Sequence, residues 1–193
     1  MLEIHPKKIA GSWDEGYVLD VHTVSSTMIG FNEFGHPEFD IVRSQLGELV
    51  YQLKYKNNKA AIVPIIEAVE AFLKTWGIHP DVIVPIPPSK FRSFQPVFEL
   101  ARALAQSLDI VLNTEALIKM KTTPQMKDIR DFSARVNALE ATFASNETLA
   151  DKTALLLDDL LQSGATLNVA AKILKLQGRV QAVHVLALTR TRN

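Results

Sequence analysis

Three short, mainly apolar runs constrain the fold of this chain more than any other feature of its sequence. They lie at residues 82–86, 153–157 and 180–188 and are rich in Val, Ile and Leu. Runs of this length without polar alternation are typical of strands that are buried on both faces, as in parallel sheets. Helical spacing of apolar residues at 94–108 and 166–177 separates the runs. The alternation predicts an α/β fold, in which helices flank a parallel sheet.

The N-terminal part of the chain has a different pattern. Residues 16–27 alternate apolar and polar side chains, which is typical of a half-buried strand. The stretch 30–37 is rich in Gly, Asn and Pro and indicates a hairpin turn. Helical spacing then predicts two helices, at residues 39–55 and 60–76, the second of which is closed by Gly77.

These patterns divide the chain into two parts. We expect a small N-terminal hood or appendage, built from a strand hairpin and a helix, over residues 1–57. Residues 58–193 then form the α/β core, which is an ordinary size for one domain. Within this core, residues 114–137 are polar, basic and poorly periodic, which indicates a mobile loop.

Composition excludes several classes of function. Lys and Arg together number 21, as do Asp and Glu, so the formal net charge is zero and we expect nucleic acid only as an indirect partner. The chain has no Cys, which excludes disulfides, a thiol nucleophile and Cys-ligated metals. No apolar run approaches the roughly 18 residues of a membrane span, and no signal-peptide pattern is present. We therefore expect a cytoplasmic protein without a membrane partner.

The second apolar run ends in two adjacent carboxylates, Asp158 and Asp159. A turn with Ser163 and Gly164 follows, and the next helix begins near Thr166. Ligands of open α/β sheets bind where strands end and helices begin. A helix start suits a phosphate group, whereas two carboxylates suit the hydroxyl groups of a sugar. The loop therefore predicts a site for a ribose and its 5′-phosphate.

The acidic pair has three other interpretations. A Walker B strand would need a Gly-x-x-x-x-Gly-Lys-Ser/Thr loop, which the sequence lacks. A receiver-type acidic pocket would place the pair on the first strand of the sheet rather than near the C-terminus. A purely structural strand, turn and helix with a Ser-Gly cap stays open on these residues alone.

From residue 154 to residue 166 the chain resembles the signature of type I phosphoribosyltransferases, which is an apolar strand, an acidic pair and a Thr/Ser-Gly-small-Thr turn. The resemblance implies a parallel sheet with a variable hood over the site. It also implies binding of phosphoribosyl pyrophosphate with Mg²⁺, and transfer of phosphoribose to an acceptor with release of pyrophosphate. The residues that it assigns to this ligand are Asp158, Asp159, Gln162, Ser163, Gly164, Ala165 and Thr166.

The resemblance gives the acidic pair a specific role. Asp158 and Asp159 would fix the ribose hydroxyls and so position the reacting carbon. The Mg²⁺ ion would arrive with the ligand, and these two carboxylates are its candidate contacts on the protein.

Gln162 indicates which branch of the family the chain resembles. Members that salvage 6-oxopurines have an Asp here that serves as the base for the purine, and an amide cannot take that proton. The chain instead resembles amido-, orotate- or ComF-type members. The segments that match the ComF-type pattern are Leu53-Lys54-Tyr55-Lys56, Val84-Pro85-Ile86-Pro87, Arg92, Phe94-Gln95, Leu100-Ala101, Gln125, Arg130, Arg135 and Asn137.

The same resemblance implies two further loops around the ligand. A pyrophosphate loop would contain Pro88, Ser89, Lys90 and Arg92. A flexible loop that closes over it would contain Lys121, Gln125, Lys127, Arg130 and Arg135. As isolated patterns, a Pro-rich turn and a basic surface segment are both common and have no required function.

Whether the chain transfers phosphoribose stays open at this point, because no residue can be named as a base for an acceptor. The alternative is a non-catalytic phosphoribosyl-binding regulator, or a DNA-uptake or DNA-processing accessory of ComF type. ComF-type proteins usually begin with a Cys-rich zinc module, for which this chain has no Cys. The expected partners are phosphoribosyl pyrophosphate or a nucleotide, and a homodimer is a possible assembly.

Overall fold

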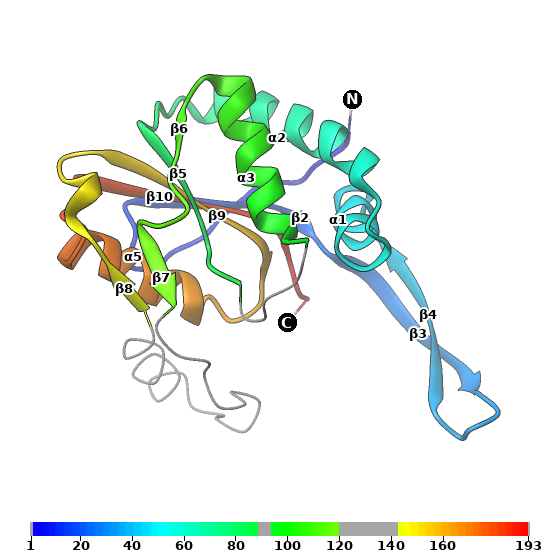
Figure 1. The fold of residues 1–193 in the computed structure, drawn as a ribbon. Helices are drawn as coiled ribbons and strands as arrows, with labels where there is room; N and C mark the ends of the chain where they lie inside the picture. The colour runs from blue at the N-terminus through cyan, green and yellow to red at the C-terminus, as the bar shows by residue number, and fades with distance from the viewer. Residues whose placement is uncertain (1, 89–93, 120–142, 193) are drawn as a thin grey trace.

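A six-stranded sheet forms the centre of the molecule, seen here in a computed structural model that describes residues 2–88, 94–119 and 143–192 (Figure 1). The strand order is β1-β2-β10-β9-β5-β6; all neighbouring pairs are parallel except β1 with β2. Helices flank this sheet, so the predicted α/β class is confirmed. The strands are β1 (Lys7–Lys8), β2 (Glu15–Val21), β5 (Val82–Pro85), β6 (Val111–Leu112), β9 (Thr153–Leu161) and β10 (Ala182–Arg190).

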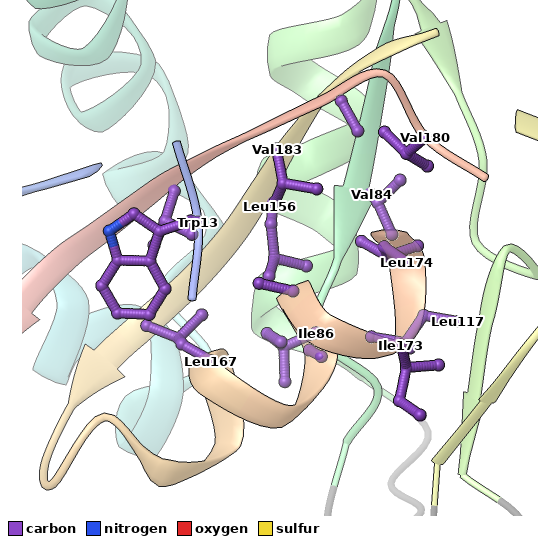
Figure 2. Packing of buried hydrophobic residues seen from close by; sticks show 14 of the residues in the cluster. Trp13, Val84, Ile86, Leu117, Leu156, Leu167, Ile173, Leu174, Val180 and Val183 are labelled. Atoms are coloured by element: carbon purple, nitrogen blue, oxygen red, sulfur yellow. The ribbon is translucent and has the colours of Figure 1, made fainter. Parts of the chain in front are cut away.

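Helices cover both faces of the sheet. Helices α1 (Gln45–Lys56), α2 (Ile62–Trp76) and α3 (Pro96–Leu108) pack on one face, and α5 (Ala165–Leu176) packs on the other. Strand β9 contributes to both cores, because Leu155 and Leu157 lie in the cluster with α1 to α3, whereas Ala154 and Leu156 lie in the α5 cluster. Figure 2 shows the α5 cluster from close by. The other helical segments within the described residues are two 3-10 turns, η1 (Lys59–Ala61) and η3 (Glu147–Leu149).

The N-terminal residues lie partly in the central sheet. Strand β2 runs parallel to β10, and Trp13 is buried in the α5 cluster. Only strands β3 (Thr23–Phe31) and β4 (Pro37–Arg43) form a separate antiparallel hairpin, which projects from the body beside α1 (Figure 1). The turn predicted at 30–37 lies at the tip of this hairpin. The division of the chain at residue 57 stays a prediction, but strands on both sides of it form one sheet.

The helix predicted at 39–55 is wrong over its first turn. Residues 39–43 lie in strand β4, and helix α1 starts at Gln45. Ser44 separates the two elements, because its backbone is extended and its side-chain oxygen accepts a hydrogen bond of 2.9 Å from the Gly47 N–H. The prediction failed here because Phe39 and Ile41 fit the helical spacing of the apolar residues that follow them, although they also alternate as in a strand.

Strands β7 (Leu117–Lys119) and β8 (Phe143–Ser145) form a second antiparallel pair. Most of the loop predicted at 114–137 lies between them, outside the described residues. The predicted helix closed by Gly77 is confirmed, because this glycine ends α2 with a left-handed φ of 74°. None of the helices in the described residues combines the length and the apolar character that a bilayer-spanning helix needs.

The packing of β9 on both faces generates a stability prediction. We expect Leu155→Ala, at a side chain with 0% exposure, to lower the free energy of unfolding by about 2–5 kcal/mol, because it removes apolar contacts and leaves a cavity. The matched control is Leu176→Ala at the end of α5, where the side chain is 78% exposed and the expected change is within about 0.5 kcal/mol. Urea unfolding measures both. Equal effects of the two substitutions would show that β9 is not a core strand.

Candidate ligand site at the carboxyl ends of strands β5 and β9

A cavity of about 370 Å³ lies where the two neighbouring strands β5 and β9 end. Its walls are residues 86–88 after β5, residues 95–98 at the start of α3, and residues 158–167 of β9, its turn and the start of α5. Lys54 of α1 closes one side. The volume is within the range of small-molecule sites, and the position is where open α/β sheets bind ligands.

Two helix N-termini line this cavity. Pro96 occupies the first position of α3, where the absence of an N–H costs no intrahelical hydrogen bond. Gly164 precedes α5 with a φ of 75°, a left-handed conformation that other residues adopt only with strain. The first turn of each helix has backbone N–H groups without intrahelical partners and a partial positive charge. The cavity therefore has two places that suit anionic groups.

The turn before α5 is held in place by Asn168. The side-chain amide of Asn168 donates a hydrogen bond of 3.0 Å to the carbonyl of Gly164. Its oxygen accepts hydrogen bonds of 2.9 Å from the Ser12 N–H and 3.2 Å from the Ser12 hydroxyl. The N-terminal segment and α5 thus fix the turn from outside the cavity.

The acidic pair lies within β9 rather than after it, because the strand continues from the predicted 153–157 to Leu161. Side chains of a strand alternate between the two faces of its sheet. Asp159 therefore lies on the side of Leu157 and helix α1, and Asp158 on the side of Leu156 and helix α5. Both carboxylates line the cavity from these opposite sides.

Asp159 is held by an ion pair with Lys54. The Lys54 ammonium lies 2.9 Å from Oδ2 and 3.0 Å from Oδ1 of Asp159, whose residue is only 7% exposed. Thr189 of β10 donates a hydrogen bond of 3.0 Å to the backbone carbonyl of Asp159. A buried carboxylate needs such partners because water no longer solvates its charge. The orientation of Asp159 is thus fixed at both its side chain and its backbone.

Asp158 has a different environment. Burial, together with the neighbouring charge of Asp159, raises the pKa of Asp158 to about 7. The Asp159 N–H donates a hydrogen bond of 2.9 Å to Oδ1 of Asp158 and opposes this rise. Near neutral pH the Asp158 carboxyl group therefore exists in both protonation states. The site thus contains one carboxylate held by an ion pair and one carboxyl group whose pKa is raised.

The structure brings together all the residues of the loop that the sequence assigned to the ligand. Those that line the cavity are Asp158, Asp159, Gln162, Ser163, Gly164, Ala165 and Thr166, together with Pro88 of the predicted pyrophosphate loop. The predicted residues Ser89, Lys90, Arg92, Lys121, Gln125, Lys127, Arg130 and Arg135 lie outside the described residues. Their roles stay predictions.

Sequence reasoning did not assign Lys54 to the site. In the sequence, Lys54 belongs to a Leu-Lys-Tyr element that matches the ComF-type pattern, at the end of a predicted helix. Of residues 95–98 at the start of α3, only Gln95 belonged to a segment matched to the family pattern, and none of the four was assigned to the site. In both cases the available signal was the resemblance alone, because nothing local indicates which face of a helix meets a distant strand.

Comparison with known proteins agrees with this architecture. The family model of the phosphoribosyl transferase domain matches residues 52–192. Competence protein ComFC of Bacillus subtilis (strain 168) is 33% identical over 124 residues, which are 59% of this chain and 48% of that protein. The match therefore spans about half of the length of ComFC.

Among solved structures, adenine phosphoribosyltransferase from Leishmania tarentolae has a TM-score of 0.50 with 10% identity, and the match covers 96% of this chain and 94% of that one. At this identity the likeness concerns the fold alone. The ComF-like resemblance found in the sequence is confirmed by the family match and by ComFC. Because the family model covers most of its length, the chain belongs to the phosphoribosyl transferase domain family.

Proposed function

We propose that this protein binds phosphoribosyl pyrophosphate with Mg²⁺ and transfers the phosphoribosyl group to an acceptor, with release of pyrophosphate. The observation that carries the proposal is the combination of an acidic pair and two helix N-termini in one cavity. Phosphoribosyl pyrophosphate has an anionic group at each end of a ribose. Its chemistry therefore matches a cavity with anion-binding sites on either side of hydroxyl acceptors.

Each part of the ligand has a place in the cavity. The 5′-phosphate would bind the first turn of α5, where Thr166 adds a hydroxyl group to the backbone N–H donors. The ribose hydroxyls would donate hydrogen bonds to Asp158 and Asp159. The pyrophosphate would lie toward Pro88 and the start of α3. Lys54 would hold the Asp159 carboxylate in place while the ligand binds.

The donor set of the site fits Mg²⁺ that arrives with the ligand. Within residues 2–88, 94–119 and 143–192, no group of three or more His, Cys, Asp or Glu side chains could hold a metal ion. Asp158 is the carboxylate that the cavity offers to the ion, since the positive charge of Lys54 already lies against Asp159. Phosphate and hydroxyl oxygens of the ligand, and water, would supply the other contacts. When bound, the ion stabilises the negative charge of the leaving pyrophosphate.

Transfer would break the bond between ribose C1 and the pyrophosphate oxygen, and a lone pair of the acceptor would form the new bond to C1. The contribution of the protein is mainly positioning, because the acidic pair holds the ribose while the helix N-termini hold its anionic ends. The acceptor would lose its proton to solvent or to the released pyrophosphate.

The similarity to ComFC, described as a competence protein, favours a second candidate function. In that function the protein binds phosphoribosyl pyrophosphate or a nucleotide as an accessory and transfers nothing. The two candidates are separated by pyrophosphate release from phosphoribosyl pyrophosphate and Mg²⁺ across a panel of nucleobase, amine and carboxylate acceptors. Release that depends on the acceptor and is lost in Asp158→Asn supports transfer; binding without release for the whole panel contradicts it.

The acidic pair generates a binding prediction. We expect Asp158→Asn to weaken the binding of phosphoribosyl pyrophosphate by about tenfold or more in calorimetry with Mg²⁺. The reason is that an amide is a poorer acceptor for ribose hydroxyls than a carboxylate. Combining it with Asp159→Asn should abolish binding. The matched control is Asp151→Asn, an exposed position at the opposite end of β9, which should bind as the unchanged protein does. Unchanged affinity in a folded Asp158→Asn variant would refute the assignment.

The raised pKa of Asp158 generates a prediction about pH. Below about 7 its carboxyl group is mostly neutral, and above about 7 it is a carboxylate that accepts hydrogen bonds from the ribose. We therefore expect the affinity for phosphoribosyl pyrophosphate to increase as the pH rises from 6 to 8. Ionisation of the ligand also contributes, so the informative quantity is the difference from Asp158→Asn. Parallel pH profiles of the two proteins would contradict the role of Asp158.

The Lys54–Asp159 ion pair generates a prediction that separates charge from packing. The Lys54 ammonium lowers the pKa of Asp158, so Lys54→Met should move the pH midpoint of binding upward. Lys54→Arg, which keeps the charge, should restore the midpoint. Lys56→Met at the exposed end of α1 is the control and should leave the profile unchanged. A Lys54→Met variant with an unshifted midpoint would show that Lys54 does not act on the acidic pair.

A further inference from the structure

His22 follows strand β2 at the same edge of the sheet as the cavity. Because β2, β10, β9 and β5 are neighbouring parallel strands, their carboxyl ends all lie at this edge. The His22 side chain is half-buried, and its ring Nδ1 lies 3.2 Å from the hydroxyl oxygen of Thr189 in β10. The same hydroxyl group donates the hydrogen bond to the backbone carbonyl of Asp159. His22 is therefore joined to the acidic pair through one buried hydroxyl group.

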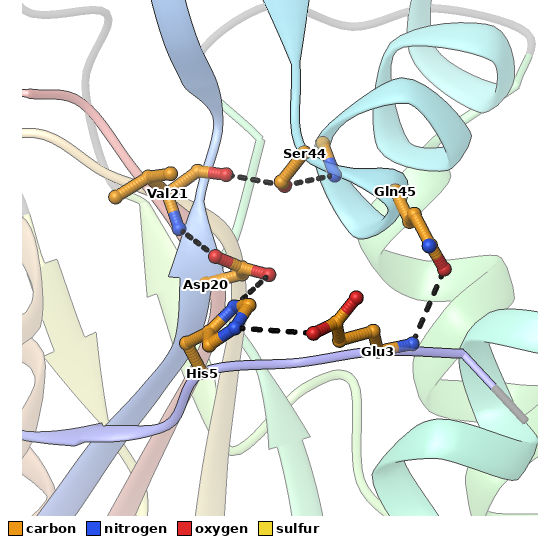
Figure 3. Close-up of polar contacts among 7 residues, drawn as sticks. Glu3, His5, Asp20, Val21, Ser44 and Gln45 are labelled. Carbon is orange, nitrogen blue, oxygen red and sulfur yellow. Dashed lines mark hydrogen bonds and ion pairs between the residues drawn. The ribbon is translucent and has the colours of Figure 1, made fainter.

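The backbone at His22 is fixed on two sides. Its N–H donates a hydrogen bond of 2.7 Å to the Arg190 carbonyl of β10. On the side of α1, the Ser44 hydroxyl donates a hydrogen bond of 2.5 Å to the carbonyl of the preceding residue, Val21 (Figure 3). Gly47 of α1 packs directly against the His22 carbonyl, where any Cβ would clash. The imidazole therefore has a defined position relative to the end of β9.

The hydrogen bonds around the imidazole assign its proton. A carbonyl oxygen can only accept, so the bond to Asp159 uses the single hydrogen of the Thr189 hydroxyl. The Thr189 oxygen must then accept from His22, which places the proton on Nδ1 and leaves a lone pair on Nε2. Within the described residues Nε2 has no hydrogen-bond partner, and it is not one of their buried, unpaired side-chain atoms. The lone pair is therefore accessible to solvent or to a ligand.

Four charged groups act on the ring from three elements. Burial, together with the positive charges of Arg43 in β4 and Lys54 in α1, lowers the pKa of His22. The negative charges of Asp159 in β9 and Glu48 in α1 oppose this effect without cancelling it. The ring is therefore mainly neutral at pH 7 and able to take up a proton. Lys54 also lines the cavity and pairs with Asp159, so one cation acts on both the ring and the acidic pair.

The order of the strands places His22 on the acceptor side of the proposed ligand. The pyrophosphate would lie beside the end of β5, and the acidic pair on β9 would hold the ribose. In a direct displacement the acceptor reaches C1 from the side opposite the leaving oxygen. Beyond β9 on that side are β10 and then β2, which His22 follows. Two strand spacings amount to about 10 Å, a span that a heterocyclic acceptor bonded to C1 could bridge.

We propose that His22 is the general base of the transfer, and that the acceptor is a compound that loses a proton from nitrogen, such as a nucleobase or an amine. This inference rests on the proposed function of the cavity. As the acceptor nitrogen forms its bond to C1, its proton passes to Nε2 of His22. The electrons of the breaking C1–O bond leave with pyrophosphate. The imidazolium then gives the proton to solvent, so solvent receives it through His22.

One substitution separates the roles of the two ring nitrogens. The Asn amide offers an N–H near the position of Nδ1, so His22→Asn keeps a donor for Thr189 and removes the lone pair of Nε2. Across the acceptor panel we expect His22→Asn to lower kcat for pyrophosphate release by about 100-fold or more, as for the loss of a general base. The affinity for phosphoribosyl pyrophosphate in calorimetry should stay within about twofold, because the base acts on the acceptor. His79→Asn, an exposed position before β5 at the opposite edge of the sheet, is the matched control and should change neither value.

Chemical rescue distinguishes a base from a structural residue. Imidazole in solution should restore part of the release by His22→Ala, because it supplies the missing base, and should not accelerate the unchanged protein. Circular dichroism melting verifies that each variant is folded. Release that His22→Asn retains, a loss in His22→Ala that imidazole does not restore, or a carboxylate as the only acceptor would overturn the role of His22 and leave the transfer standing. No release by the unchanged protein with any acceptor would overturn the transfer and the role of His22 together.

Discussion

Strand β9 sets the geometry on which the site depends. It has a parallel hydrogen-bonded neighbour on each side, β10 and β5, and apolar side chains buried on both faces. A strand held in this way has one register and one direction, because a shift by one residue would exchange its two buried faces. The same register places Asp158 and Asp159 on opposite faces at the point where the cavity opens. The position of the acidic pair is therefore fixed by the packing of the core.

The second determinant is the ion pair that joins α1 to the end of β9. Lys54 satisfies the buried Asp159 carboxylate, and this leaves Asp158 as the group whose protonation changes near neutral pH. Because their surroundings differ, one of the two adjacent acids forms an ion pair and the other has a raised pKa. Because the hairpin of β3 and β4 leads directly into α1 through Ser44, the N-terminal residues are structurally connected to the candidate site. The N-terminal residues supply strands of the sheet, the Ser44 cap of α1 and the cation of Lys54.

Local patterns predict the parts of this fold that depend on local chemistry. The runs at 82–86, 153–157 and 180–188 could be predicted as strands because burial on both faces requires mainly apolar side chains. The turn before α5 was predicted because it needs Gly164. Strand β2 was not placed in the central sheet, since its alternation resembles that of a half-exposed strand. The pairing of Lys54 with Asp159 joins residues 105 positions apart, and no local pattern contains such a contact.

A crystal structure of the protein with phosphoribosyl pyrophosphate and Mg²⁺ tests the central claim most directly. The account predicts the ribose hydroxyls within hydrogen-bond distance of Asp158, and the 5′-phosphate against the first turn of α5. It also predicts the pyrophosphate on the side of Pro88 and α3. A ligand bound elsewhere, or one whose phosphate lies on the acidic pair, would contradict it.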